Sequence, residues 1–281
     1  MKQIVRVLFL SLLIVLAACN SDEPVSNESA ENKEGHQEEE QEQETDIADE
    51  KTEVEEVEDE ENEMDSKEKE SEPLYKVSDN WSIVPIDEGT DEKVILLTID
   101  DAPDQYAVEM AKTLKELDVN AIFFVNGHFL DTPEEEAKLK EIHDMGFIIG
   151  NHTYSHPLLS DISDEEQKEE IVELNNRVEE IIGERPKFFR APHGVNTDFS
   201  KQIVEEEGMK LMNWSFGYDW EEQYRTKEAL TDIMVNTELL GNGSNLLMHD
   251  REWTAAALES IVTGLQNKGY ENVDPNLIQT K

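Results

Sequence analysis

The chain has 281 residues, of which 67 are acidic and 24 are basic, so its formal net charge at pH 7 is -43. This balance argues against a nucleic-acid partner, because such a partner requires a basic surface that neutralises phosphates. The acidity is compatible with a saline or alkaline habitat.

The first eighteen residues have the pattern of an export signal. Lys2 and Arg6 precede an apolar stretch at 7–16, which is too short for a membrane span but typical of a signal-peptide core. The tripeptide Leu-Ala-Ala then leads to Cys19, the only cysteine, as at a bacterial lipoprotein cleavage site. We therefore expect a lipoprotein signal peptide at 1–18 and a mature chain anchored through diacylated Cys19, since two acyl chains give stable anchoring. A plain secretory signal with an incidental cysteine is the alternative.

Residues 19–72 are predicted to form a lipid-anchored, disordered acidic linker. From residue 20 onward this segment holds 25 Asp and Glu, four Lys and no aromatic residue. Such a composition cannot bury enough apolar surface to offset the entropy lost on ordering. As a flexible coil it would span roughly 40 Å and hold the following domain away from the membrane, within a cell-wall matrix. An acidic tail that binds a partner is the alternative.

The remaining residues, 73–281, are expected to form one α/β domain. Apolar runs that are typical of buried strands alternate with stretches of helical periodicity. These runs lie at 94–99, 121–125, 147–149, 188–189, 210–214 and 245–248. Repeated strand-then-helix units imply parallel strands with helices outside, either in an open doubly wound sheet or in a barrel.

Several helix boundaries can be located directly. Ser163 and Glu166 form a capping-box signature before an apolar periodicity that continues to Ile182, and Gly183 can end this helix. Three further glycines occupy similar stopping positions, namely Gly146, Gly208 and Gly269.

Five short polar motifs lie at or just beyond the ends of the apolar runs. They are Thr98-Ile-Asp-Asp101, His152-Thr-Tyr-Ser-His156, Arg190-Ala-Pro-His193, Asp219-Trp220 and Leu247-Met-His249. In both candidate architectures, active sites gather at the carboxyl ends of the strands. Five separated segments are therefore expected to deliver polar groups to one rim, a pattern that indicates an enzyme.

Two histidines and two aspartates in these motifs favour a metal site. A lone histidine is usually structural, whereas His152 and His156 are four residues apart, which on a helical turn places both imidazoles on one side. Asp100 and Asp101 end a buried strand and can divide labour, one as metal ligand and the other as base. Taken alone, the aspartate pair also fits a helix cap or a surface turn.

The donor set predicts the kind of metal. One oxygen ligand, two nitrogen ligands and no thiolate favour Zn2+, with Co2+, Ni2+ and Mn2+ as the alternatives. Three protein ligands leave positions for water and substrate, which is typical of a catalytic site rather than a structural one.

In this order and at this spacing, the five motifs resemble those of the polysaccharide deacetylases with a NodB-homology domain, carbohydrate esterase family 4. The resemblance extends over residues 93–281. It implies a distorted (β/α) barrel with about seven parallel strands, which agrees with the alternation of strands and helices. It also implies that 73–281 is a catalytic domain.

The resemblance implies a role for each matched residue. Asp101, His152 and His156 would bind one divalent metal. Asp100 would be the general base, paired with Arg190.

On the other side of the expected site, His249 would be the general acid and Asp219 would tune it. The remaining matches are contacts to the substrate, namely Pro192, His193, Trp220 and Leu247.

These roles form a coherent reaction. A bound divalent metal lowers the pKa of water, so that Asp100 can accept a proton as the water attacks an acetamide carbonyl. A backbone N–H near Pro192 and His193 would stabilise the oxyanion, and charged His249 would protonate the departing sugar amine. The products would be acetate and a glucosamine-type amine. Taken alone, His249 also fits a core histidine and Arg190 a surface salt bridge.

Two positions depart from the family pattern. Ala102 stands where a glycine usually follows the aspartate pair, and alanine does not readily adopt a positive φ. His193 stands where a tyrosine is common, and it is a candidate for an extra metal or substrate contact. We expect these changes to alter substrate choice more than the reaction. Four aromatic side chains are candidates for stacking on sugar rings, with plain packing as the alternative: Tyr154, Tyr218, Trp220 and Trp253.

We therefore expect an enzyme, a metal-dependent polysaccharide deacetylase that removes N-acetyl groups from an extracellular N-acetylglucosamine-type polysaccharide. Peptidoglycan is the leading substrate, given the anchor and the spacer. Chitin oligomers, poly-N-acetylglucosamine and O-acetylated xylan are the alternatives. A catalytically silent carbohydrate-binding lipoprotein on the same fold is a second hypothesis. A solute-binding lipoprotein would need two lobes and a hinge, of which a single strand-and-helix series gives little sign.

The N-terminal features predict where the enzyme works. A chain anchored through Cys19 would lie on the extracellular face of the bacterial cell membrane and contact the membrane through its lipid only. The acetylated polysaccharide is the expected partner, and the protein is expected to be a monomer.

Overall fold

The computed structural model describes residues 72–281. The expected signal peptide, Cys19 and the linker as far as residue 71 lie outside the described residues. Within 72–281, every helix is too short or too polar to cross a membrane.

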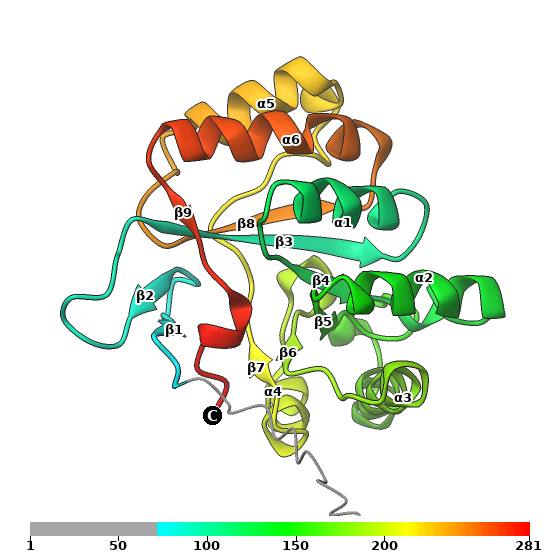
Figure 1. Ribbon diagram of the computed structural model, residues 1–281. Helices are drawn as coiled ribbons and strands as arrows, with labels where there is room; N and C mark the ends of the chain where they lie inside the picture. The colour runs from blue at the N-terminus through cyan, green and yellow to red at the C-terminus, as the bar shows by residue number, and fades with distance from the viewer. Residues whose placement is uncertain (1–71) are drawn as a thin grey trace, which may run out of the picture. The chain divides into compact units, whose positions relative to one another are not determined.

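A parallel sheet of seven strands forms the centre of the described domain (Figure 1). The strands are hydrogen-bonded in the order β7-β6-β5-β4-β3-β8, and β9 pairs with β3. Their bounds are β3 Val94–Ala102, β4 Ile122–Val125, β5 Ile148–Asn151, β6 Phe188–Phe189, β7 Lys210–Leu211, β8 Ser244–His249 and β9 Glu271–Asn272. All of their pairings are parallel, as the strand-then-helix alternation of the sequence requires.

The segment at 210–216 pairs with β6 and also bridges to β8 at the other edge of the sheet, and it thereby curls the sheet into a distorted barrel. β7 pairs with β6, and the next residue, Met212, donates its backbone N–H to the carbonyl of Phe189 at 2.9 Å. Farther along the same segment, Phe216 forms an isolated parallel bridge with β8 and accepts a hydrogen bond from the N–H of Leu247 at 2.9 Å. The expected α/β fold, a distorted barrel with about seven parallel strands, is therefore confirmed.

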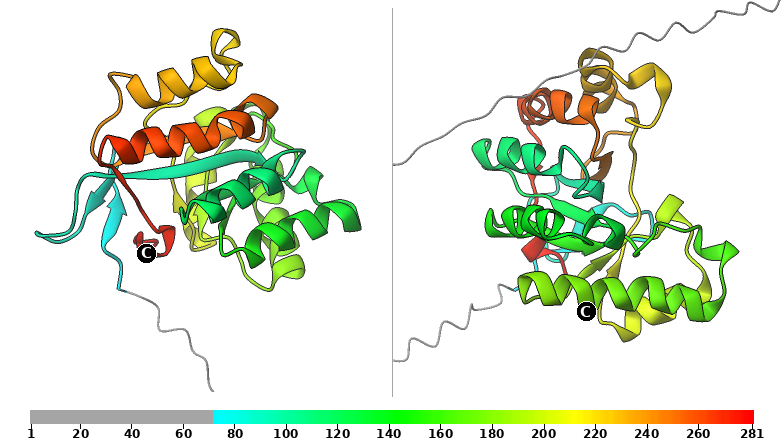
Figure 2. Two further views of the ribbon diagram at one scale, coloured as in Figure 1. Left: turned by 45° about the horizontal axis from the view of Figure 1, so that its top comes forward. Right: turned by 90° about the vertical axis from the view of Figure 1, so that its right-hand side faces the viewer.

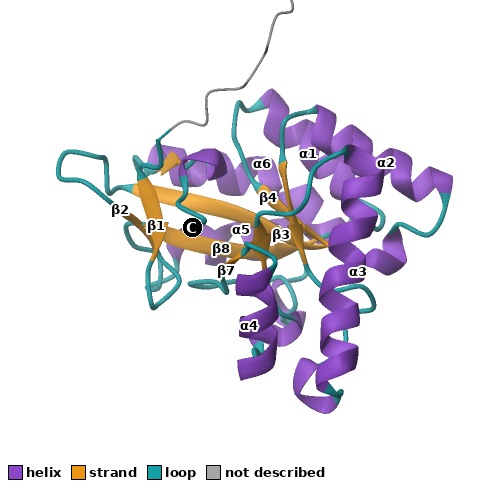
Figure 3. Ribbon diagram, turned by 90° about the horizontal axis from the view of Figure 1, so that it is seen from below, coloured by secondary structure: helices purple, strands orange, loops and turns teal. Residues whose placement is uncertain are grey.

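Six helices of the described domain cover the outside of the sheet. Their bounds are α1 Ala107–Glu116, α2 Pro133–Asp144, α3 Asp164–Ile182, α4 Asp198–Glu206, α5 Lys227–Asn236 and α6 Glu252–Asn267. Neighbouring helices contact one another in the order α5, α6, α1, α2, α3, α4. In Figures 1 and 2, α5 and α6 lie together beside β8, and Figure 3 shows α3 and α4 at the other end of this series.

The helix boundaries follow the sequence signals. Ser163 accepts a hydrogen bond from the N–H of Glu166, whose carboxylate accepts one from the N–H of Ser163, so the expected capping box is present at the start of α3. Gly183 ends α3 with φ 80°, a left-handed conformation that glycine adopts without strain.

Alternate residues of β3 pack into two different cores. Ile95, Leu97 and Ile99 contact the helices, whereas Val94 and Leu96 belong to a second core inside the barrel. Since side chains alternate across a strand, the next even-numbered residues, Thr98 and Asp100, also point inward. The alternation along β3 thereby places Thr98 and Asp100 inside the barrel, near the carboxyl end of the strand.

Apolar side chains from the two ends of the described domain fill the barrel interior around Val94 and Leu96, at the start of β3. A two-stranded antiparallel hairpin, β1 Tyr75–Val77 and β2 Ile83–Pro85, contributes Tyr75 and Ile83 to the inner core. The C-terminal segment contributes Val273 and Ile278, and Ile278 forms a bridge with Tyr75. Neither this hairpin nor the two-residue β9 shows a periodic apolar pattern in the sequence.

Candidate active site

The carboxyl ends of four strands carry four of the five predicted motifs to one rim, and the fifth, Asp219-Trp220, follows the bridge that Phe216 forms with β8. β3 ends in the aspartate pair, β5 is followed by His152, β6 by Arg190, and β8 ends at His249. The register of β3 and β8 makes Asp100 and His249 direct neighbours on adjacent strands. Residues 149 positions apart in the sequence therefore face the same space.

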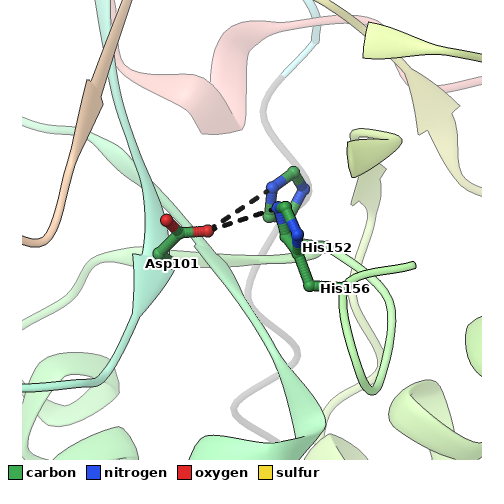
Figure 4. Close-up of side chains that lie close together, drawn as sticks. All are labelled: Asp101, His152 and His156. Carbon is green, nitrogen blue, oxygen red and sulfur yellow. Dashed lines mark ion pairs between the residues drawn. The ribbon is translucent and has the colours of Figure 1, made fainter. Parts of the chain in front are cut away.

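Three side chains form a compact group of possible metal ligands (Figure 4). Asp101 Oδ1 lies 3.8 Å from His152 Nε2 and 3.5 Å from His156 Nε2. One ligand atom from each residue lies within 4.8 Å of the others. One carboxylate and two imidazoles at this spacing match the donor set of a catalytic zinc site.

Both imidazoles are prepared to act as neutral ligands. His152 Nδ1 lies 2.7 Å from the carbonyl oxygen of Arg190, and because a carbonyl only accepts, Nδ1 carries the proton and Nε2 keeps its lone pair. Burial lowers the pKa of His152. Burial, followed by the neighbouring His152, lowers the pKa of His156 to about 4.

Asp101 supplies the charge of the group. Burial alone would raise the pKa of this carboxyl, but His249, the two neighbouring histidines and Arg251 outweigh burial and lower it. Asp101 is therefore a carboxylate near neutral pH, which is the form that binds a cation.

The two histidines do not converge on a helical turn, and that part of the expectation was wrong. Residues 152–158 form a loop in which Thr153 and His156 adopt left-handed conformations, with φ 68° and 60°. The side-chain amide of Asn126 donates to the carbonyls of His152 and Thr153 at 2.7 and 3.1 Å, and Asn151 Oδ1 accepts from the N–H of Thr153 at 2.9 Å. These two asparagines hold the turn through its backbone.

Left-handed backbone is concentrated in this site. Of the six non-glycine residues with positive φ in 72–281, four belong to the predicted motifs: Asp101, Thr153, His156 and His193. Each such residue costs on the order of 1–3 kcal/mol and persists only where the surroundings fix it. The rest of the domain therefore stabilises a strained arrangement at this rim.

Asp100 and Arg190 form a buried ion pair. Asp100 Oδ1 accepts a hydrogen bond from Arg190 Nη1 at 2.6 Å, and Asp100 Oδ2 lies 3.5 Å from His152 Nε2. The Arg190 side chain is completely buried, stacks on the ring of Phe124 at 4.3 Å, and also donates to the hydroxyl of Thr98 at 2.8 Å. Arg190 is thus not the surface salt bridge that its sequence context alone left open.

His249 is paired with a second buried carboxylate. Its Nδ1 lies 2.7 Å from Asp219 Oδ1, and its backbone N–H donates to Asp219 Oδ2 at 2.6 Å. Burial alone would lower the pKa of His249, but the charge of Asp219 and the hydrogen bond to it outweigh burial and raise the pKa. The hydroxyl of Thr254 and the indole N–H of Trp253 fix Asp219 from behind, at 2.8 and 2.7 Å.

One side of the predicted site is apolar and contains two of the predicted substrate contacts, Trp220 and Leu247. The ring of Trp220 lies edge to face with that of His249, 5.6 Å between centroids, and the Trp220 residue is 43% exposed. Leu247 is buried beneath it on β8, and Gly217 separates the two, since a Cβ there would lie 2.8 Å from the Trp220 ring. The other three aromatic candidates are partly buried and pack against the main core: Tyr154, Tyr218 and Trp253. Each also makes a hydrogen bond, to Asp131, Thr237 and Asp219 respectively.

The remaining predicted substrate contacts lie in η3 Pro192–Gly194, directly after β6. Pro192 is buried, whereas His193 is exposed and its ring lies 5.0 Å from that of His156.

The two departures from the family pattern fit the backbone differently. The left-handed conformation falls on Asp101, with φ 61°, and not on Ala102. Ala102 is buried in β3 and pairs with Val125, so alanine is accommodated there without a positive φ. His193 does have a positive φ, at 58°.

Sequence reasoning missed several residues that hold the site. Asn126 and Asn151 end or follow apolar runs as the predicted motifs do, so the same strand-end rule applied to amides would have found them. Asp250 and Arg251 immediately follow the fifth motif, and Arg251 Nη2 donates to Asp101 Oδ2 at 2.7 Å. That contact joins residues 150 positions apart and has no local signal.

Comparison with known proteins gives consistent relatives. The family model for polysaccharide deacetylase matches residues 87–212. The chain is 30% identical over 197 residues to a peptidoglycan-N-acetylglucosamine deacetylase of Bacillus cereus, a match that covers 66% of this chain and 68% of that protein. It is 31% identical over 188 residues to the peptidoglycan-N-acetylmuramic acid deacetylase PdaA of Bacillus subtilis, covering 65% of this chain and 70% of that protein.

Solved structures agree with these relatives. A peptidoglycan N-acetylglucosamine deacetylase superimposes with a TM-score of 0.61 at 28% identity, over 68% of this chain and 90% of that one. A pseudoenzyme of carbohydrate esterase family 4 from Bacillus anthracis superimposes with a TM-score of 0.60 at 27% identity, over 66% of each chain. The curled parallel sheet, the polar groups at its strand ends and the extent of these matches lead to one assignment: the chain belongs to the polysaccharide deacetylases of carbohydrate esterase family 4.

Proposed function

We propose that this enzyme hydrolyses N-acetyl groups of peptidoglycan and releases acetate. The observation that carries the proposal is the pairing of Asp100 with His249 across β3 and β8, beside three possible metal ligands. Each has a buried partner of opposite charge, Arg190 for Asp100 and Asp219 for His249. A site with a carboxylate base, an imidazolium acid and neighbouring residues that could hold a divalent cation suits amide hydrolysis.

Asp101, His152 and His156 would hold one divalent cation, for which we propose Zn2+. The fit rests on their donor atoms, on the lowered pKa values of both imidazoles, and on the unprotonated Nε2 of His152, which keeps its lone pair. Bound there, the cation would supply Lewis-acid chemistry, polarising the acetamide carbonyl and making water more acidic.

The protein's own residues would carry the proton from water to amine. Asp100 would accept the proton of the attacking water, while the hydrogen bond from Arg190 Nη1 holds that carboxylate in place. The backbone N–H of His193 would donate to the oxyanion. His249 would then give its proton to the leaving amine, which is too basic to depart as an anion, and Asp219 would stabilise the imidazolium before that step.

Trp220 and Leu247 would position the substrate. The exposed Trp220 ring offers a face to a sugar, and the buried Leu247 at its base would take the acetyl methyl group. Peptidoglycan is proposed because the relatives are named for its N-acetylglucosamine or N-acetylmuramic acid units.

The proposal is tested by acetate release from purified cell wall, chitin oligomers and acetylated xylan. Zinc-loaded enzyme is expected to act best on cell wall, and Asp100→Asn and His249→Ala are expected to lose about 10²–10⁴-fold in rate. If the enzyme acted best on chitin oligomers or on acetylated xylan, that glycan would replace peptidoglycan as the proposed substrate. Equal acetate from wild type and both variants on every glycan would support the second hypothesis, a silent carbohydrate-binding protein. The Bacillus anthracis neighbour is itself described as a pseudoenzyme of this family.

We further propose that the chain works as a monomer on the extracellular face of the bacterial membrane, held by lipid on Cys19 and spaced by the disordered acidic linker at 19–72. The signal-like residues 1–18 and the composition of the linker support this location. Cys19→Ser should release the protein into the medium with its deacetylase activity intact. Retention of that variant at the membrane would contradict lipid anchoring.

A further inference from the structure

Arg251 lies two residues after β8, at the N-cap of α6, and touches the proposed metal ligand from the side away from the histidines. Its Nη2 donates to Asp101 Oδ2 at 2.7 Å, whereas the other oxygen of the carboxylate, Oδ1, faces His152 and His156. The two oxygens of Asp101 therefore have separate partners. One is engaged by the guanidinium, and one is directed into the group of metal ligands.

The backbone around Arg251 is fixed to the same strand end. Asp250 donates its N–H to the carbonyl of Asp100 at 3.0 Å, and its own carbonyl accepts from Arg251 Nη1 at 2.9 Å. The buried carboxylate of Asp250 also accepts the backbone N–H groups of Asp104 and Tyr106, at 2.8 and 2.6 Å. The guanidinium and the loop that follows Asp101 are thus parts of one hydrogen-bonded unit.

We propose that Arg251 is a positioning residue that holds Asp101 as a one-oxygen ligand and thereby sets the affinity and geometry of the metal site. By engaging Oδ2, the guanidinium fixes the carboxylate rotamer and prevents both oxygens from turning toward the cation. The inference rests on the proposed metal site at Asp101, His152 and His156, and it assigns to that site a residue outside the five motifs.

Two opposing effects decide the direction of the change. The guanidinium repels a bound cation, which would weaken binding, but the Arg251 side chain is 38% exposed and solvent screens that repulsion. Asp101 is only 16% exposed and has a left-handed backbone, so without Arg251 its Oδ2 would lose a partner that water replaces poorly. Loss of the residue that orients a metal ligand typically weakens metal affinity about 10–100-fold. Orientation therefore outweighs repulsion.

The test compares metal binding by Arg251→Met, Arg251→Lys and Lys201→Met. Lys201→Met removes one positive charge from an exposed ion pair on α4 and serves as the matched control. Zn2+ affinity is measured on metal-free protein by competition with a chromophoric chelator, and the visible absorption of the Co2+-loaded protein reports coordination geometry. Thermal unfolding of each metal-free variant confirms that it is folded.

We expect Arg251→Met to bind Zn2+ about tenfold or more weakly and to show an altered Co2+ spectrum. Arg251→Lys should recover part of the affinity, and Lys201→Met should match wild type. Wild-type affinity and spectrum in Arg251→Met, or tighter binding, would overturn the role of Arg251. Should wild type itself bind no metal, or bind it equally well after His152→Ala, the proposed function would fail instead, so the two failures are distinct.

Discussion

The buried carboxylate of Asp219 controls the proton on His249. It accepts both the imidazole Nδ1–H and the backbone N–H of His249, and the pKa of His249 is raised although burial alone would lower it. An acid catalyst must hold its proton until the leaving group needs it. The arrangement keeps His249 charged to a higher pH than a free histidine.

Asp219→Asn keeps the shape of this contact but removes its charge, so the pKa of His249 should fall. The active acid form disappears as pH rises through the pKa of the folded protein. A lower pKa therefore moves the alkaline limb of kcat/KM to lower pH. Acetate release by wild type and variant between about pH 5 and pH 9 measures this shift. Identical alkaline limbs would refute the role of Asp219.

Arg190 is expected to contribute to stability as well as to catalysis. Arg190→Met leaves the Asp100 carboxylate buried without its cation, and breaking a buried pair in this way typically costs about 3–5 kcal/mol. Urea unfolding of the metal-free proteins measures the loss, and Asp100→Asn added to Arg190→Met should recover part of it. Lys201→Met, from an exposed pair, should leave the unfolding free energy unchanged. Equal losses of unfolding free energy in Arg190→Met and Lys201→Met would contradict a stabilising buried ion pair.

At the scale of single elements, β3 and the loop after β5 show what sequence reasoning can reach. The apolar run at 94–99 predicted a strand, and its alternation turns Asp100 into the barrel. The four-residue spacing of His152 and His156 instead suggested a helical turn. Spacing alone carries no information on the left-handed residues of this loop, which Asn151 and the distant Asn126 hold in place. Strands of two or three residues, such as β9 and β1, are too short to show a period.

The loop after β5 should depend on Asn126. Asn126→Ala removes two donors to buried carbonyls, which should cost about 1–3 kcal/mol of unfolding free energy and weaken Zn2+ binding, because the histidines lose their fixed turn. Urea unfolding and chelator competition measure the two effects. Asn236→Ala on α5, where the amide bonds an exposed Asp232, is the control and should change neither quantity. Unchanged metal affinity in Asn126→Ala would mean that the turn holds without this amide.

At the scale of the whole domain, the site draws on the ends of β3, β5, β6 and β8 in one curled sheet and on the segment after β7 that carries Asp219. The order of motifs and the strand-and-helix alternation predicted that sheet and its catalytic rim. The barrel closure through Phe216 and the contact of Arg251 with Asp101 could not be predicted, because both join segments far apart in sequence through three-dimensional position alone.

A cation that joins the end of β3, through Asp101, to the loop after β5, through His152 and His156, should stabilise the entire fold. At a free Zn2+ concentration one hundred times the Kd, the gain is about 2.7 kcal/mol. Removal of the metal by a chelator should therefore lower Tm, and re-addition should restore it. His152→Ala should show neither change. An equal fall in Tm for wild type and His152→Ala would place the stabilising metal elsewhere.

The most direct test of the central claim joins metal content and acetate release in one variant, Asp100→Asn. Asp100 is the proposed base and lies outside the ligand group, so the variant should retain one zinc per chain yet release acetate from peptidoglycan about 10²–10⁴-fold more slowly than wild type. Wild-type acetate release by a zinc-loaded Asp100→Asn protein would contradict the proposed mechanism.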